Sequence, residues 1–372
     1  MESLWSPFRL GGTVLPSRIV RTAVAESYCT PKGRPLPALR DHYALLGREG
    51  AVGLMIMGFV VVAPSGRKRE RQALLASDEA IRPMSRVTEA ARRDGGRIFA
   101  QLNHAGVVAE RSVIHECPKG PSPLPERLVA GGPLTEAGEA MTAEDIELVT
   151  EAFIRAAERA RKAGFDGVQL HAAHGFLLSQ FLSPLFNRRE DAWGGDNARR
   201  ARLVLDIIRG IRKVCGDDFP VIAKVNGSDM LEGGLTPEQS AEQVALMVEA
   251  GLDGVEVSGG SCIFAPVERT PFQRPDVKVN QGMFFAADTA IIRARVDIPV
   301  IYMGGIRTLP QAEGIVQADK NALVGLCRPL LRDPMLALQW KHGAREESDC
   351  LACNGCLSES RSMHGVRCVL PL

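Results

Sequence analysis

The sequence predicts an α/β protein of the (β/α)8 barrel class with a C-terminal cysteine-rich loop. Short apolar segments typical of buried parallel strands alternate with helical segments along most of the chain. One of these segments ends in two histidines three residues apart, His171 and His174, followed by Gly175. Because barrel enzymes gather their catalytic groups at the C-terminal ends of the strands, this pair indicates an active site there.

Eight strands are expected, each a short apolar run between helical patterns. They cover residues 18–21, 53–57, 97–101, 167–170, 221–225, 254–257, 300–303 and 322–325. An open, doubly wound sheet of similar length is the alternative that this rhythm leaves open.

Two helices have clear start signals. The spacing of Thr142 and Asp145 predicts a capped helix over 142–163, and Thr236 followed by Pro237 predicts another over 236–250. The segment 106–141 is rich in proline and glycine, and we expect it to be a lid over the barrel mouth. The chain thus divides into a barrel over 1–340 and a cysteine-rich tail over 341–372.

Charge and composition exclude several classes of function. The 45 Lys and Arg residues nearly balance the 44 Asp and Glu residues, so no basic face for nucleic acid is expected. The chain has neither a secretion signal at its start nor an apolar run long enough to span a membrane. We therefore expect a cytoplasmic protein that acts on a small molecule, and homo-oligomerisation is compatible with this sequence.

Four of the nine cysteines crowd into the last 23 residues: Cys350, Cys353, Cys356 and Cys368. Without a secretion signal, such a cluster favours metal ligation over disulfides. Spacings of two residues let neighbouring sulfurs face one centre, as in iron–sulfur and zinc sites.

The run from His171 to Gly195 resembles the Old Yellow Enzyme family of FMN-dependent oxidoreductases, and the resemblance extends from Trp5 to Pro334. It implies a barrel in which His171 and His174 hold a substrate oxygen above the flavin. Such a pair can polarise a conjugated carbonyl, so that hydride adds at the β-carbon. Metal binding by the pair ranks lower, because no third ligand lies at a convincing spacing.

The prediction of an FMN site rests on two lines of evidence, the residues at the strand ends and the family resemblance. The ends of the seventh and eighth predicted strands are expected to bind the FMN phosphate. They contain Gly304, Gly305, Cys327 and Arg328. The resemblance implies that Gln101 and Lys224 contact the isoalloxazine ring. It also implies that backbone from Ala23 through Val24 to Ala25 passes its N5 side. For Lys224, a buried structural pair with a carboxylate is the alternative.

Phe176 departs from the family, because most members carry a proton-donating tyrosine at this place. Of the three tyrosines in the chain, Tyr28 is the best replacement. Three hypotheses follow: water or Tyr28 supplies the proton, the reaction runs chiefly as an oxidation or desaturation, or the acceptor takes electrons without needing a carbon acid.

The cysteine tail resembles the [4Fe-4S] loop of the 2,4-dienoyl-CoA reductase and trimethylamine dehydrogenase branch. Cys353 and Cys356 are separated by two residues, where that branch generally has three. Those relatives continue into a domain that binds FAD and a pyridine nucleotide, which is expected to be lacking here.

The predicted function is hydride transfer between NAD(P)H and an α,β-unsaturated carbonyl compound, with a [4Fe-4S] cluster or structural zinc in the tail. The alternatives are an oxidative demethylase or desaturase on the same scaffold, and an electron-transfer subunit fed by a partner flavoprotein.

Overall fold

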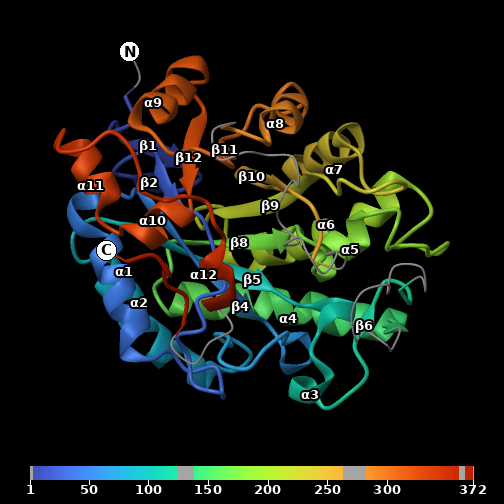
Figure 1. Cartoon of the computed structure of the whole chain (residues 1–372). Helices are drawn as coiled ribbons and strands as arrows, with labels where there is room; N and C mark the ends of the chain where they lie inside the picture. The colour runs from blue at the N-terminus through green and yellow to red at the C-terminus, as the bar shows by residue number, and fades with distance from the viewer. Residues whose placement is uncertain (1–2, 125–137, 263–281, 360–364, 372) are drawn as a thin grey trace.

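The computed structural model describes residues 3–124, 138–262, 282–359 and 365–371 of the chain. Within them, eight parallel strands form one closed barrel, and helices surround it (Figure 1). In spatial order, the barrel strands are β3 (Ile19–Arg21), β4 (Leu54–Val61), β5 (Arg97–Asn103), β8 (Gly167–Ala172), β9 (Val221–Ser228), β10 (Gly254–Gly259), β11 (Val300–Met303) and β12 (Ala322–Leu326). Every predicted strand is confirmed, and closure of the barrel excludes the open doubly wound sheet.

The helices follow the strands in the alternation that the sequence predicts. The longer ones are α1 (Pro37–Leu46), α2 (Ile81–Arg92), α4 (Ala143–Lys162), α6 (Asn197–Cys215), α7 (Pro237–Glu249), α8 (Ala286–Arg293) and α9 (Leu309–Ala318). Both predicted start signals are confirmed, because Thr142 and Thr236 each accept a hydrogen bond from the backbone of the third helical residue. Each cap satisfies an N–H group that would otherwise lack a partner in the helix.

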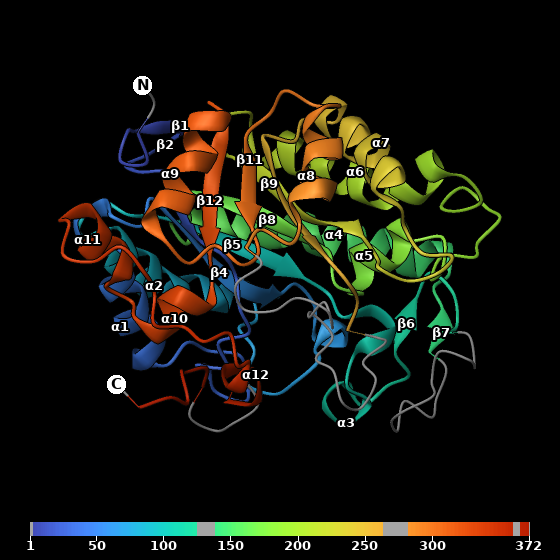
Figure 2. The ribbon, with the colours of Figure 1, turned by 45° about the horizontal axis from the view of Figure 1, so that its top comes forward.

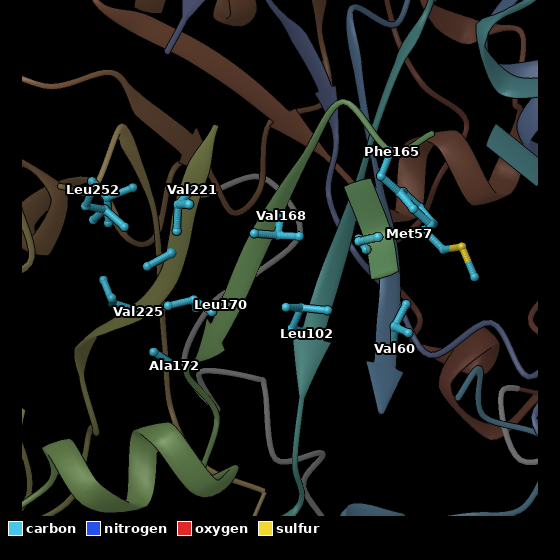
Figure 3. Packing of buried hydrophobic residues seen from close by; sticks show 14 of the residues in the cluster. Met57, Val60, Leu102, Phe165, Val168, Leu170, Ala172, Val221, Val225 and Leu252 are labelled. Atoms are coloured by element: carbon cyan, nitrogen blue, oxygen red, sulfur yellow. The ribbon is translucent and has the colours of Figure 1, made fainter. Parts of the chain in front are cut away.

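An apolar layer joins the strands to this helical ring. Figure 3 shows part of it, with Leu102 on β5 beside Val168 and Leu170 on β8. All three are fully buried, so each contributes about 1.5–3 kcal/mol relative to an exposed position. These contacts hold the strands in register and thereby fix the relative positions of their C-terminal ends.

A short N-terminal hairpin closes the opposite end of the barrel. It consists of β1 (Phe8–Leu10) and β2 (Thr13–Leu15), which pair antiparallel. Phe8, Leu10 and Leu15 belong to one apolar cluster with side chains near the strand starts, including Val20 and Leu54. This hairpin was not predicted from the sequence. Because it covers the end where the barrel strands begin, the open mouth is at the C-terminal ends of the strands.

The predicted lid over 106–141 is not a structureless loop in its described part. It contains η4 (Gly106–Val108), α3 (Arg111–Ile114), β6 (Lys119–Gly120) and β7 (Glu139–Ala140), while residues 125–137 lie outside the described part. The backbone hydrogen bond from Met141 N to Gly120 O, 2.8 Å long, joins the described part before residues 125–137 to the described part after them.

Further short helices lie in the later part of the chain: α5 (Leu177–Leu182), α10 (Arg328–Arg332), α11 (Leu336–Lys341) and α12 (Gly355–Glu359). In Figure 2, α3, β6, β7 and α12 lie on the side toward which the arrows of β11 and β12 point. The predicted lid and the cysteine tail are therefore both on the side of the barrel mouth.

Candidate functional site

The two histidines lie at the end of β8, as predicted. His171 is the penultimate residue of this strand, and its ring centroid is 5.4 Å from that of His174. The backbone of His174 has a φ of 65°, and its N–H donates to Asn226 Oδ1 at 3.0 Å. Its Nε2 lies 2.7 Å from Ser258 Oγ, which orients the ring. The Nδ1 atom of His171 is buried and makes no hydrogen bond to the described residues.

Both rings are held in the neutral form. Burial, aided by the nearby Lys224 ammonium, lowers the pKa of His171 to about 3. Burial and Lys224 also lower the pKa of His174 well below its ordinary value. A neutral imidazole carries one N–H donor. Each ring can therefore donate one hydrogen bond to a substrate oxygen, but neither is protonated to act as an acid near neutral pH.

A chain of buried polar side chains crosses the barrel beneath the histidines. Gln101 Nε2 donates to Gln169 Oε1 at 2.7 Å, and Gln169 Nε2 donates to Glu256 Oε2 at 2.8 Å. Lys224 Nζ completes the chain at 2.8 Å from Glu256 Oε1, with both side chains at most 5% exposed. The buried carboxylate partner considered for Lys224 is therefore present, and it is Glu256.

Strand register explains this network. Glu256 is aligned with Lys224 between β10 and β9, and Gln101 is aligned with Gln169 between β5 and β8. Aligned residues of neighbouring parallel strands point to the same side of the sheet. Lys224 is also aligned with His171 between β9 and β8, which accounts for its effect on the histidine.

The backbone from Ala23 to Ala25 follows β3 as an irregular, half-buried segment that reaches the neighbouring strands. A Cβ atom placed on Gly58 of β4 would lie 2.4 Å from Ala23 Cβ and 3.1 Å from Gln101 Oε1. The ends of β3, β4 and β5 therefore meet closely beside the polar network.

Beyond Ala25, a buried ionic cluster anchors this segment. Arg21 Nη1 lies 3.1 Å from Glu26 Oε1, and the hydroxyl of Tyr43 donates to the same oxygen. Burial raises the pKa of Glu26 to about 7, against the opposing effect of Arg21.

The residues that are predicted to bind the FMN phosphate lie at the ends of β11 and β12. Gly304 and Gly305 have φ values of 96° and 83°, which glycine adopts without strain. Cys327 precedes α10, and Arg328 is its first residue. Arg328 Nη1 donates to Asn354 Oδ1 of the cysteine tail at 2.6 Å. Because a guanidinium carries five N–H donors, this contact leaves others for an anion.

The residues present fit FMN. A turn without side chains and an arginine suit the phosphate at the ends of β11 and β12. Gln101 and Lys224 are buried polar residues that would contact the polar edge of the flavin ring.

Phe176 and Tyr28 have different surroundings. Phe176 is 3% exposed, and its ring centroid lies 4.6 Å from that of His171 and 5.0 Å from that of Phe59. Tyr28 donates its hydroxyl proton to the carbonyl of Val366 in the tail at 2.6 Å. The structure therefore brings Phe176, and not the hydroxyl of Tyr28, into contact with the histidine pair.

The cysteine tail is docked on the barrel but does not form a metal site in the described residues. Cys350, Cys353 and Cys327 are all close enough to Cys356 to influence its thiol electrostatically, while burial is the main cause that raises its pKa to about 11. Cys368 influences Cys350 in the same way. No three His, Cys, Asp or Glu side chains of the described part are arranged to hold a metal ion.

Several site residues were missed by sequence reasoning: Gln169, Asn226, Glu256, Ser258 and Glu26. A signal existed for two of them, because Gln169 and Glu256 are polar residues within otherwise apolar strand segments. Such residues are rarely buried without partners. The others lie in strand ends and loops, where the sequence pattern carries no such signal.

The described helices do not combine the length and apolar character that crossing a membrane requires.

Comparison with known proteins assigns the family. The model of the NADH:flavin oxidoreductase / NADH oxidase family matches residues 3–347. The chain is 33% identical over 376 residues to a metal reductase of Desulforamulus reducens, covering 100% of this chain and 53% of that protein. It is also 33% identical over 335 residues to an NADPH dehydrogenase of Bacillus licheniformis, covering 90% and 92% of the two chains.

The solved structure of morphinone reductase in complex with tetrahydroNAD matches with a TM-score of 0.77 at 26% identity, covering 94% of this chain and 93% of that one. The chain spans about half the length of some curated relatives, the metal reductase among them. The family match, in contrast, extends over almost the whole chain. The chain therefore belongs to the NADH:flavin oxidoreductase / NADH oxidase family, the Old Yellow Enzyme family of flavin oxidoreductases.

Proposed function

We propose that the protein is an FMN-dependent oxidoreductase that transfers hydride from NADH or NADPH to an α,β-unsaturated carbonyl compound. The observation that carries this proposal is the pair of neutral imidazoles at the barrel mouth, that of His171 buried and that of His174 partly buried. The NADPH dehydrogenase relative and the tetrahydroNAD complex of morphinone reductase support a pyridine nucleotide as the reductant.

FMN, when bound, supplies two-electron chemistry as a hydride acceptor and donor. The side chains of this protein orient the substrate and stabilise the charge that develops on it. Hydrogen bonds from His171 and His174 to the carbonyl oxygen strengthen as the oxygen gains negative charge. Ser258 and Asn226 hold His174 in place, so its hydrogen bond needs little reorganisation when the charge appears.

Removal of either imidazole tests the role of the pair. His171→Ala or His174→Ala should weaken the binding of phenols, which place an oxygen where the substrate carbonyl binds, while the FMN content changes little. Titration with a phenol, followed through its charge-transfer absorbance with the flavin, measures this affinity. Wild-type phenol affinity in both variants would exclude the proposed contact.

For the cysteine tail, the proposed ligands are Cys350, Cys353, Cys356 and Cys368, for a [4Fe-4S] cluster or for zinc. Their support is the spacing and the common neighbourhood of the four thiols. The tail has to draw its thiols closer to form such a site, because the described geometry does not present three ligands together.

A second candidate function is that of an electron-transfer subunit that receives electrons from a partner flavoprotein. The contact between Arg328 and Asn354 favours it, because it joins the cysteine tail to the predicted phosphate site. Iron and zinc analysis of anaerobically purified protein, with its visible spectrum, separates the two functions. Bound iron with slow direct oxidation of NAD(P)H favours the subunit, whereas zinc or no metal with fast oxidation favours the free-standing reductase.

A further inference from the structure

Lys68 lies against Phe176, the residue that stands where most family members carry the proton-donating tyrosine. Its Nζ atom lies over the Phe176 ring, 5.2 Å from the centroid. That ring in turn contacts His171, with the two centroids 4.6 Å apart. Lys68 lies in the loop after η2 (Pro64–Gly66), where no sequence motif marks it as a site residue.

Two sets of contacts hold the ammonium group at this place. The side-chain oxygen of Gln72 accepts hydrogen bonds from the backbone N–H groups of Lys68 and Arg69, each 2.8 Å long. At the other end, Lys68 Nζ donates to Cys262 Sγ at 3.2 Å. The backbone N–H of Cys262 bonds to the carbonyl of His174 at 2.9 Å. The ammonium is thus connected, through Cys262, to the segment that carries the histidine pair.

The effect of the Lys68 charge on His171 is consistent with a position near the histidine pair. The charge of Lys68 contributes, as a minor cause after burial and Lys224, to the lowered pKa of His171. An ammonium group and a phenol have similar ordinary acidities, with pKa values of about 10. A lysine can therefore supply the same proton as the tyrosine that other family members use. The side chain is partly exposed, so water can return the proton after each turnover.

We propose that Lys68 is the proton donor of the oxidative half-reaction, in place of the tyrosine that Phe176 replaces; this inference rests on the proposed function. Hydride reaches the β-carbon, and the π electrons of the carbon–carbon double bond move toward the carbonyl oxygen held by His171 and His174. An N–H bond of Lys68 then breaks, its proton bonds to the α-carbon, and its electron pair remains on the nitrogen. The carbonyl re-forms, and the resulting amine takes a proton from water.

Stopped-flow measurement of the two half-reactions tests this role, with 2-cyclohexen-1-one as a neutral substrate. Lys68→Met should slow reoxidation of the reduced flavin by about 10²–10⁴-fold, the usual contribution of a positioned acid. Reduction by NAD(P)H should hardly change. Lys68→Arg should be as slow as Lys68→Met, because a guanidinium keeps the charge but does not release its proton. Lys162→Met, which removes a half-exposed lysine of α4, is the matched control and should behave as wild type.

Phe176→Tyr provides the second arm. In the wild-type background this change should alter reoxidation less than about threefold, because a donor is already present. In the Lys68→Met background it should restore most of the lost rate. FMN content and phenol affinity, measured in each variant, show that the pocket is intact. Should Lys68→Met fail to fold, a large acceleration by Phe176→Tyr alone would still refute the inference.

Each remaining outcome has a definite meaning. Wild-type reoxidation rates in Lys68→Met overturn the inference but leave the proposed function standing. A fast Lys68→Arg variant also overturns it, because the lysine then acts through its charge and not by releasing a proton. Failure of the enone to reoxidise the wild-type flavin overturns the proposed function together with this inference.

Discussion

The buried pair of Lys224 and Glu256 should be energetically coupled, and a double-mutant cycle measures the coupling. Glu256 has no exposed surface and Lys224 is about as deeply buried, with 2.8 Å between their charged atoms. Removing one partner of such a pair leaves an unpaired charge in a medium of low dielectric constant, at a cost of about 3–5 kcal/mol. We expect a loss of this size in the free energy of unfolding for Lys224→Met and for Glu256→Gln.

The double variant should be less destabilised than the sum of the two single variants. With both charges removed, neither is left without a partner. The glutamine that Glu256→Gln introduces keeps a side-chain oxygen, which can still accept the hydrogen bond that Gln169 donates in the wild type. We expect a coupling energy of about 2 kcal/mol or more, as for residues in direct contact.

Denaturant titration provides the assay, followed by fluorescence and by circular dichroism to check that the two transitions coincide. Titrations at two concentrations of FMN separate the stability of the fold from the affinity for the cofactor, because a ligand of the folded state adds its own stabilisation. Single variants that add to within about 0.5 kcal/mol would refute the reasoning, since sites that do not interact behave in this way.

Two further predictions concern the phosphate site and acid stability. Arg328→Ala should weaken FMN retention by about 1.5–3 kcal/mol, the range for a hydrogen bond to a charged group; unchanged retention in equilibrium dialysis would remove Arg328 from the site. Burial lowers the pKa of His42 and His171 to about 3 and that of His104 to about 4. The unfolded chain therefore binds more protons below about pH 6.5, and each histidine should destabilise the fold by about 2 kcal/mol at pH 5. The raised pKa of Glu26, about 7, acts in the opposite sense and offsets one histidine; no net loss of stability between pH 7 and pH 5 would contradict this assignment.

The sequence was sufficient for the barrel because its strand signals are local. A short run of mostly apolar residues between turn signals, such as Val300–Met303, predicts a buried parallel strand without any knowledge of its neighbours. The hairpin of β1 and β2 escaped prediction for the opposite reason. Strands of three residues, such as Phe8–Leu10, are too short to show a period, and their burial depends on a barrel that later segments build.

Polar residues at strand ends can be picked out from the sequence, whereas contacts that require two strands to be aligned cannot. His171 and Lys224 can be found from their own segments. Their relation to Glu256 depends on the register of β8, β9 and β10, which the sequence does not display. The contact between Lys68 and Cys262 joins residues 194 positions apart, in two loops whose approach is a property of the whole fold.

The charges around the barrel mouth explain why a separate proton donor is needed. Lys224 is paired with Glu256. Its positive charge nevertheless acts together with burial to lower the pKa of His171. Neutral imidazoles serve as hydrogen-bond donors to a developing oxyanion, and a protonated imidazole would tend to lose its proton to that oxygen instead. The environment that keeps both histidines neutral therefore favours hydrogen bonding to the substrate oxygen. It also prevents them from donating a proton to the α-carbon. Because Phe176 has no hydroxyl, the partly exposed ammonium of Lys68 is the group placed to complete the reaction.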